Sequence, residues 1–283
     1  MSHLPDIYYK ELLERILTEG SWDKNPRPHW ADGTPAHALS VNHHLISFDL
    51  QKEFPVCTLR YAPWKSAIGE ILWIYQDQSN DLDVLRDKYD VKWWDDWEVG
   101  NTRTIGTVYG ETVRRHDMMN HLLDGLKNNP DNRYNVMSLW QVDDFKEPHG
   151  LKPCCFQTIW NVRYEDDQPV LDMVLTQRSC DSMLGIYSNW VQYAALQLIV
   201  AHCLGYKPGK FSWFGVNIQI YDRHISAAQE IVKRKSIKTI PKFIIKTDER
   251  DFYKIKMEDL NIIGYDKDLI NQINPQIKME IAI

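Results

Sequence analysis

Three kinds of residue between positions 151 and 193 could together do chemistry on a polar ring that carries an anionic group. Cys154 follows a proline, and a thiol becomes a nucleophile where nearby positive charge stabilises its thiolate. Arg178 and Ser179 offer a guanidinium fork beside a hydroxyl, which suits a phosphate. Asn189 could give one donor and one acceptor to a ring edge that bears C=O and N–H. We therefore expect the rest of the chain to build a pocket around these residues.

Each candidate residue also has an ordinary structural interpretation, and spacing alone leaves the structural and the functional interpretation open. A single cysteine is more often a small core residue, and Asn189 could cap the helix that follows it. Glu70 lies among apolar residues at helical spacing. It could be a helix-end or salt-bridge residue, or a buried carboxyl with a raised pKa that relays protons. Arg27 lies in a loop, where an arginine is either solvated or an anion ligand.

The elements that must position these residues follow from hydrophobic spacing. Helical spacing predicts helices over 6–19, 64–76, 117–128, 191–205 and 222–234. Alternation predicts strands over 36–50, 134–141, 155–164, 169–177 and 211–221. If strands 155–164 and 169–177 pair, Arg178 comes close to Cys154. Because helices and strands mix without regular βαβ alternation, we expect an α+β fold with one sheet and packed helices, in a single domain over residues 1–283.

Composition narrows the class of protein. Charged residues make up 25% of the 283 residues, and the net charge of −6 argues against DNA or membrane surfaces as partners. No apolar run is long enough for a bilayer, and the first residues do not read as a signal peptide. The five cysteines suit free thiols in the cytoplasm. Dinucleotide, P-loop and zinc motifs are absent from the sequence, so we expect no bound nicotinamide, ATP or metal.

The eleven tryptophans are unusual for this length. Trp93, Trp94 and Trp97 cluster with polar residues, which favours either a pocket for a flat conjugated ligand or a tryptophan-rich core.

Motifs along nearly the whole chain resemble those of the thymidylate synthase family in order and spacing. They are Phe54-Pro55-x-x-Thr58, Glu70-Ile71-Leu72-Trp73, Trp94-Asp95-Asp96-Trp97, Val108-Tyr109-Gly110, Asn129-Pro130-Asp131-x-Arg133, Pro153-Cys154, Gln177-Arg178-Ser179-x-Asp181, Leu184-Gly185 with Asn189, Ile220-Tyr221 with His224, and the tail 278–283. The loop 32–37 is similar to that of a bacterial branch.

The resemblance implies a fold and a reaction. The fold is a thymidylate-synthase-like domain with a mixed sheet, in an obligate homodimer whose sheets pack back to back. The reaction transfers one carbon from the co-substrate 5,10-methylenetetrahydrofolate to C5 of a pyrimidine nucleoside monophosphate. For dUMP the products are dTMP and dihydrofolate. No metal is implied.

The resemblance also implies a role for each site residue. Cys154 would add to C6 of the pyrimidine, Tyr109 would help remove the C5 proton, and Glu70 would organise waters for proton transfer. Asn189 would read N3 and O4 of uracil. The nucleotide would also be held by Arg27, Arg178, Ser179, Gln219, Tyr221 and, from the partner subunit across the interface, an arginine at position 133 (Arg133). Folate would meet Arg60, Trp94, Trp97, Asp181 and Ile283.

Several pocket positions depart from the family pattern. Tyr134 stands where a second arginine is usual, Asn217 and Gln219 where Asp and His are usual, Tyr187-Ser188 where Pro-Phe is usual, and Arg60 where a lysine is usual. The catalytic positions are kept, so the departures bear on which nucleotide is used rather than on the carbon transfer.

Two alternatives to dUMP methylation follow. A pyrimidine-nucleotide 5-hydroxymethylase acting on CMP or dCMP would quench the exocyclic methylene with water instead of hydride. Deoxycytidylate hydroxymethylases resemble this family but carry Asp at the pocket amide, so Asn189 favours uracil. A non-catalytic nucleotide- or RNA-binding relative would be expected to lack Cys154, Glu70 or Tyr109, and all three are present.

Overall fold

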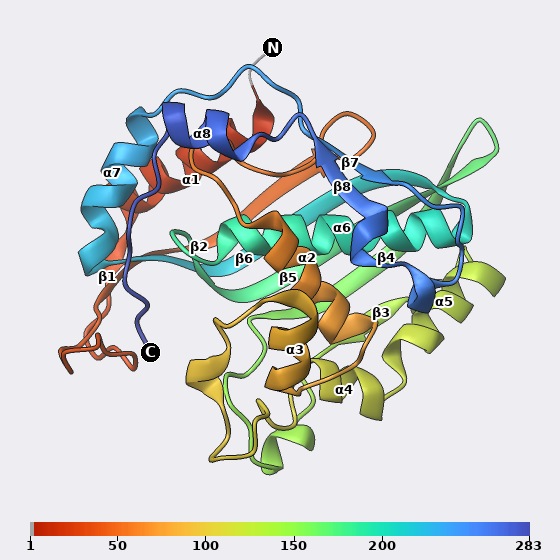
Figure 1. Ribbon diagram of the computed structural model, residues 1–283, viewed down its shortest axis with the longest axis horizontal. Helices are drawn as coiled ribbons and strands as arrows, with labels where there is room; N and C mark the ends of the chain where they lie inside the picture. The colour runs from red at the N-terminus through yellow and green to blue at the C-terminus, as the bar shows by residue number, and fades with distance from the viewer. Residues whose placement is uncertain (1–2) are drawn as a thin grey trace.

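A six-stranded mixed sheet lies at the centre of the computed structural model, which describes residues 3–283 (Figure 1). Its strand order is β1-β2-β6-β5-β4-β3, and all neighbours are antiparallel except β5 and β6. The strands span Ser21–Trp22 (β1), Ala38–Asp49 (β2), Val136–Ser138 (β3), Cys155–Glu165 (β4), Gln168–Asp181 (β5) and Lys207–Tyr221 (β6). A two-stranded antiparallel sheet pairs β7 (Lys242–Ile245) with β8 (Leu260–Ile263). The predicted α+β class with a mixed sheet and packed helices is confirmed, and the β7–β8 sheet is an addition to the single sheet that we expected.

The helix α6 (Ile186–Leu204) connects the parallel strands β5 and β6 and is the central helix of the fold. Parallel neighbours need a crossover of this kind. The helix packs against β5 and β6 and also against α2 (Trp64–Tyr75), so it is apolar around most of its circumference. Gly205 ends it in the left-handed conformation, with φ 71°.

The other helices surround this centre. The helices α1 (Leu4–Glu19) and α7 (Ile225–Lys233) lie side by side, and α1 also packs on β2 (Figure 1). The remaining helices are α3 (Leu82–Tyr89), α4 (Gly110–Arg115), α5 (Met118–Asn128) and α8 (Lys267–Ile273). The 3₁₀ turns among residues 3–283 are η1 (Asp95–Trp97), η2 (Asp144–Lys146), η3 (Asp222–His224), η4 (Phe252–Lys254) and η5 (Met257–Asp259).

The strands and helices near the site differ from the sequence predictions mainly at their ends. The predicted strand 134–141 is a strand only at 136–138, and the predicted strand 169–177 continues to Asp181. The helix predicted over 191–205 begins at Ile186. Its first turn was missed because Tyr187, Ser188 and Asn189 interrupt the apolar pattern. The predicted pairing of strands β4 and β5 is confirmed.

One face of the main sheet is open. Leu45, Phe214 and Thr176 are register partners across β2, β6 and β5, so their side chains point to the same side. The Leu45 side chain is 65% exposed. Alternate residues of the same strands, such as Phe48 and Phe211, are buried under the helices on the other face. Exposed apolar side chains on a sheet face, such as Leu45, are typical of a surface that meets another protein.

Candidate active site

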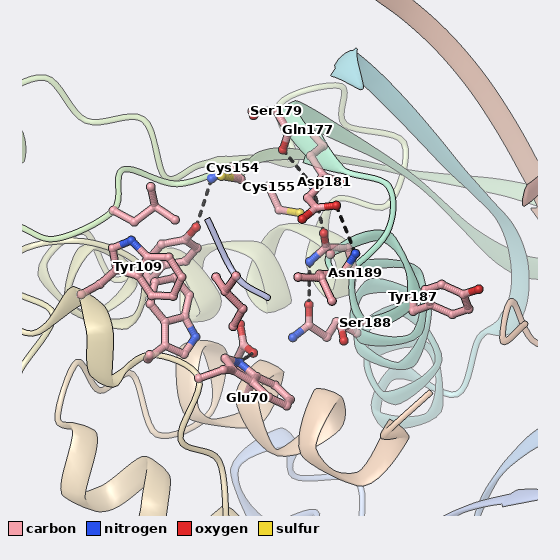
Figure 2. Close-up of a pocket in the computed structure, with 18 of the residues that line it drawn as sticks. Glu70, Tyr109, Cys154, Cys155, Gln177, Ser179, Asp181, Tyr187, Ser188 and Asn189 are labelled. Atoms are coloured by element: carbon pink, nitrogen blue, oxygen red, sulfur yellow. Dashed lines mark hydrogen bonds between the residues drawn. The ribbon is translucent and has the colours of Figure 1, made fainter. Parts of the chain in front are cut away.

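A cavity of about 810 Å³ lies where the ends of β4, β5 and β6 meet α2, α6 and the C-terminal tail. Figure 2 shows Cys154, Glu70, Tyr109 and Asn189 around this space. The predicted site residues that line it are Arg27, Arg60, Glu70, Trp94, Trp97, Tyr109, Cys154, Arg178, Ser179, Asp181, Asn189, Gln219 and Tyr221. The structure therefore brings together side chains that are far apart in the sequence.

Cys154 is held on both sides of its backbone. Its N–H donates to the Tyr109 hydroxyl oxygen at 3.0 Å, and its carbonyl accepts from the Arg178 backbone N–H at 2.9 Å. The Arg178 guanidinium also donates to the carbonyls of Pro153 and Lys152, at 2.8 and 2.7 Å. The pairing of β4 with β5 therefore places a cation on the loop that carries the thiol.

The electrostatic surroundings separate Cys154 from its neighbour. Burial raises the pKa of the Cys154 thiol, while the charges of Arg178 and Arg27 act against this rise. Burial raises the pKa of the Cys155 thiol further, to well above its ordinary value. Of the two, Cys154 is thus the better candidate for a thiolate.

Tyr109 has an unusual backbone conformation, with φ 50° and ψ −111°. Such a positive φ is costly for a residue with a side chain. The next residue, Gly110, leaves no room for a side chain, since a Cβ there would lie 2.0 Å from the Ser79 carbonyl oxygen. This tight turn aims the buried Tyr109 ring at Cys154.

Glu70 is buried within α2 rather than lying at a helix end. Burial raises the pKa of this carboxyl to about 7, although the side chains of Trp93, Trp94 and Gln192 act to lower it. The Trp93 indole N–H donates directly to the Glu70 carboxylate at 2.5 Å. The salt-bridge interpretation is therefore wrong, and a carboxyl that titrates near neutral pH can both give and take a proton.

Asn189 lies inside the first turn of α6, so its interpretation as a helix cap is wrong. Gly185 is the N-cap residue, and the Asn189 N–H donates to its carbonyl at 3.0 Å. The Asn189 side-chain oxygen accepts from Gln177 at 2.9 Å, and its nitrogen donates to Gln192 at 3.0 Å. Two glutamines therefore hold this amide at the cavity wall.

A polar end of the cavity suits an anion and a sugar. Arg178, Ser179 and the exposed Arg27 line it. Gln219 donates to the Ser179 hydroxyl at 3.3 Å, while the buried Gln219 side-chain oxygen has no partner among the described residues. Tyr221 is half-buried beside them.

Other parts of the cavity wall are aromatic. Trp94 meets Trp97 and Tyr109 edge to face, with ring centroids 5.5 and 5.0 Å apart. The Arg60 guanidinium is only 7% exposed and lies over the Tyr187 ring at 4.3 Å. Among residues 3–283 it forms no ion pair, and its Nε and the Trp94 indole nitrogen have no hydrogen-bond partner. Buried donors without partners are suited to a polar flat ligand.

Two predicted residues lie outside this cavity. Arg133 is exposed beside Tyr134, which is itself 87% exposed. The terminal Ile283 exchanges two backbone hydrogen bonds with His29, of 2.6 and 3.0 Å, and the neighbouring Ile281 and Ala282 line the cavity instead. The tail is therefore fastened to the loop that carries Arg27.

Sequence reasoning gave no role to several residues that the structure places at the site. Gln177 was only part of a motif, and Gln192 was not singled out, yet both bond to Asn189. Gln192 lies three residues after Asn189, on the same face of the helix, and this spacing could have revealed it.

Residues 3–283 contain no group of three or more His, Cys, Asp or Glu side chains that could hold a metal ion. In the same residues no helix is both long and apolar enough to span a bilayer.

The fold and the cavity define a protein that brings a thiol, a carboxyl that titrates near neutral pH and a buried amide to one ligand-sized space. A family model described as thymidylate synthase matches residues 7–283. A thymidylate synthase of Streptococcus pneumoniae (strain 70585) is 46% identical over 280 residues, covering 98% of this chain and 99% of that protein. One of Streptococcus gordonii (strain Challis) is 44% identical over the same length. The solved structure of a thermostable thymidylate synthase A from Bacillus subtilis covers 99% of both chains at 31% identity, with a TM-score of 0.89. The chain belongs to the thymidylate synthase family of methyltransferases.

Proposed function

We propose that this protein transfers one carbon from 5,10-methylenetetrahydrofolate to C5 of dUMP, forming dTMP and dihydrofolate. The observation that carries this proposal is the convergence of Cys154, Glu70 and Asn189 on one cavity. These residues supply a nucleophile, a carboxyl that titrates near neutral pH, and an amide that can read a ring edge. The names of the relatives support the same reaction.

The chain's own residues divide the work on the nucleotide. The Cys154 thiolate adds to C6 of the uracil ring, which moves the ring electrons toward O4 and makes C5 a carbon nucleophile. Asn189 donates to O4, where the negative charge develops, and accepts from N3–H. Glu70 exchanges protons at the ring, and Tyr109 helps to remove the proton from C5. Departure of the Cys154 sulfur restores the aromatic ring.

The phosphate and sugar fit the polar end of the cavity. Arg178 and Arg27 would pair with the phosphate, with the Ser179 hydroxyl beside them. Tyr221 and the unpaired oxygen of Gln219 would bond sugar hydroxyls. A bound phosphate keeps Arg178 and Arg27 in place beside the thiol.

The aromatic part of the cavity wall fits folate, which supplies the carbon unit and a hydride when bound. Trp94 and Trp97 form flat walls. The Trp94 indole N–H has no hydrogen-bond partner among residues 3–283, so it would donate to an acceptor on the co-substrate. Arg60 would pair with an anionic tail of the co-substrate. Asp181 also lines the cavity, with its carboxylate accepting from the N–H groups of Met183 and Leu184.

We also propose a homodimer that forms through the open face of the sheet. Leu45 is 65% exposed and its register partner Phe214 is half-buried, which supports a back-to-back partner on this face. Arg133 is exposed outside its own cavity, which supports its donation to the partner's phosphate site. The five free thiols suit the cytoplasm.

The comparisons give no support to hydroxymethylation of CMP or dCMP, or to a non-catalytic binding role. The test is to incubate the protein with 5,10-methylenetetrahydrofolate and dUMP, dCMP, UMP or CMP, following dihydrofolate absorbance and product mass. We expect dihydrofolate and a methylated product with dUMP only. A hydroxymethyl product without dihydrofolate would overturn the proposal.

A variant fixes the assignment of the nucleophile. We expect Cys154→Ala to abolish turnover and to retain dUMP binding in calorimetry, with Cys155→Ala as the matched control that stays active. An active Cys154→Ala protein would move the nucleophile to Cys155.

A further inference from the structure

A chain of hydrogen bonds runs through four side chains behind the cavity wall. The Trp213 indole N–H donates to the Gln177 side-chain oxygen at 2.8 Å. The Gln177 side-chain nitrogen donates to the Asn189 oxygen at 2.9 Å, and the Asn189 nitrogen donates to the Gln192 oxygen at 3.0 Å. Figure 2 shows Gln177 and Asn189 joined at the wall. Each member donates to the next in the same direction.

The Trp213 end of this chain cannot be reversed. An indole N–H only donates, so Gln177 must turn its oxygen toward Trp213. The Gln177 nitrogen also donates to the Ser179 carbonyl at 3.1 Å, which holds the same orientation from a second side. Trp213 is 0% exposed and Gln177 2% exposed, so water cannot replace a lost partner.

The Gln192 end has the matching polarity. The Gln192 side-chain nitrogen is buried and has no hydrogen-bond partner within residues 3–283. The Gln192 amide is near enough to Glu70 to lower the pKa of that carboxyl, so the far end of the chain meets an acceptor. A donor-only indole at one end and a carboxyl at the other favour one direction for all three amides.

The direction of the chain fixes which way the Asn189 amide faces. If Asn189 alone turned over, its nitrogen would face the Gln177 nitrogen and its oxygen would face the Gln192 oxygen. If all three amides turned over, the buried Trp213 N–H would lose its acceptor. The remaining lone pair and N–H of Asn189 are therefore presented to the cavity in one order only.

We propose that Trp213 and Gln192 are positioning residues that lock the orientation of Asn189 and so select uracil over cytosine. This inference rests on the proposed function of the same cavity. Uracil presents N3–H and O4, whereas cytosine presents an unprotonated N3 and an amino group, which is the reverse pattern. Cytosine therefore requires the Asn189 orientation that this chain of hydrogen bonds excludes.

The test compares dUMP and dCMP binding by calorimetry, without folate and without turnover. Trp213→Phe keeps an aromatic ring and removes the N–H that fixes the chain. We expect the ratio of the dCMP Kd to the dUMP Kd to fall roughly tenfold or more, the effect of one buried unpaired group. The matched control is Trp160→Phe, because Trp160 is equally buried on β4 and donates to Thr158 rather than to the chain. Its ratio should stay at the wild-type value.

Gln192→Met is a second variant that removes the acceptor at the other side of Asn189 and keeps a side chain of similar length. We expect it to lower the same ratio, so the inference stays testable if Trp213→Phe fails to fold. A purely structural role for either residue would weaken both nucleotides equally and leave the ratio unchanged, which overturns the inference. A wild-type protein that prefers dCMP also overturns it. A wild-type protein that binds neither nucleotide instead removes the proposed function itself.

Discussion

The Tyr109 hydroxyl oxygen accepts a hydrogen bond of 3.0 Å from the Cys154 backbone nitrogen, and the two residues are 45 positions apart in the chain. This bond fixes a phenol beside the thiol before any substrate arrives. Because the Cys154 carbonyl is held by Arg178 at the same time, the nucleophile is positioned by its backbone rather than by its side chain. The Tyr109 phenol that would help to take the C5 proton therefore also holds the backbone of the nucleophile in place.

Tyr109→Phe should therefore damage stability and turnover together. The variant leaves the Cys154 N–H without its acceptor, which costs roughly 1–3 kcal/mol of unfolding free energy for a buried donor. We expect turnover to fall roughly 10²- to 10⁴-fold, the usual contribution of a positioned proton-transfer group. Urea unfolding and steady-state kinetics measure the two effects. Tyr75→Phe is the matched control, since Tyr75 is a buried tyrosine that bonds Tyr193 and does not line the cavity. If both variants lose turnover equally, the Tyr109 hydroxyl has no special role.

Glu70 should make the stability of the ligand-free protein depend on pH. Burial raises the pKa of this carboxyl from 4.5 to about 7. Between these values the folded protein keeps a proton that the unfolded chain releases, so stability falls as pH rises and levels off above about 7. A shift of this size corresponds to roughly 3 kcal/mol.

The variant Glu70→Gln cannot ionise, so it should lose this slope. We expect it to match the wild type near pH 4.5 and to be more stable than the wild type at pH 8, while losing turnover. Chemical unfolding across the pH range checks this. Glu258→Gln, at an exposed position, should keep the wild-type slope. A steep slope that persists in Glu70→Gln would place its origin in another group.

Much of the site was readable from the sequence because its residues lie in short motifs on long elements. Cys154 and Arg178 flank strands with clear alternation, and pairing those strands was enough to bring the two together. The cluster of Trp93, Trp94 and Trp97 proved to line the cavity, whereas Trp160 and Trp213 are core residues. Both interpretations of the tryptophans were thus partly right.

What the sequence could not give depends on contacts between distant segments or on capping. Spacing within α2 leaves the role of Glu70 open, because the loop that carries Trp93 helps to bury this carboxyl. The short helix α3 has few apolar residues, and its start depends on the Asp81 carboxylate, which accepts from the N–H groups of Asp83 and Val84. The amide chain behind Asn189 joins β5, β6 and α6, so no local pattern could predict it.

Arg178 should set the ionisation of the nucleophile as well as hold the loop. Its charge acts to lower the pKa of the Cys154 thiol, so Arg178→Ala should raise that pKa further. We expect the pH midpoint of Cys154 alkylation by iodoacetamide, followed by mass spectrometry, to move upward. Below the midpoint the rate should fall roughly tenfold for each pKa unit.

Two comparisons separate charge from loop support in this experiment. Arg178→Lys keeps the charge and loses the fork that bonds Pro153 and Lys152, so its midpoint should lie between those of the wild type and Arg178→Ala. Arg163→Ala removes a cation from β4 that pairs with Asp172 and should leave the midpoint unchanged. A faster reaction with an unmoved midpoint would mean that Arg178 acts only by shielding the thiol.

Arg133 should complete the phosphate site of the partner subunit if the proposed homodimer forms. Within its own subunit this arginine is exposed and lies outside the cavity, so its loss should weaken dUMP binding only through the partner.

A mixed dimer of two variants tests this arrangement. Cys154→Ala lacks the nucleophile and Arg133→Ala lacks the crossing arginine, so each dimer alone should be impaired. In a mixed dimer, one site receives Cys154 from one subunit and Arg133 from the other and is fully wild type. Refolding the two variants together should therefore restore roughly a quarter of wild-type activity, since half the dimers are mixed and each has one intact site. Tyr134→Arg, at the neighbouring exposed position, should tighten dUMP binding in the same dimer. Activity of the mixture that is only the average of the two parents would show that Arg133 serves no site across an interface.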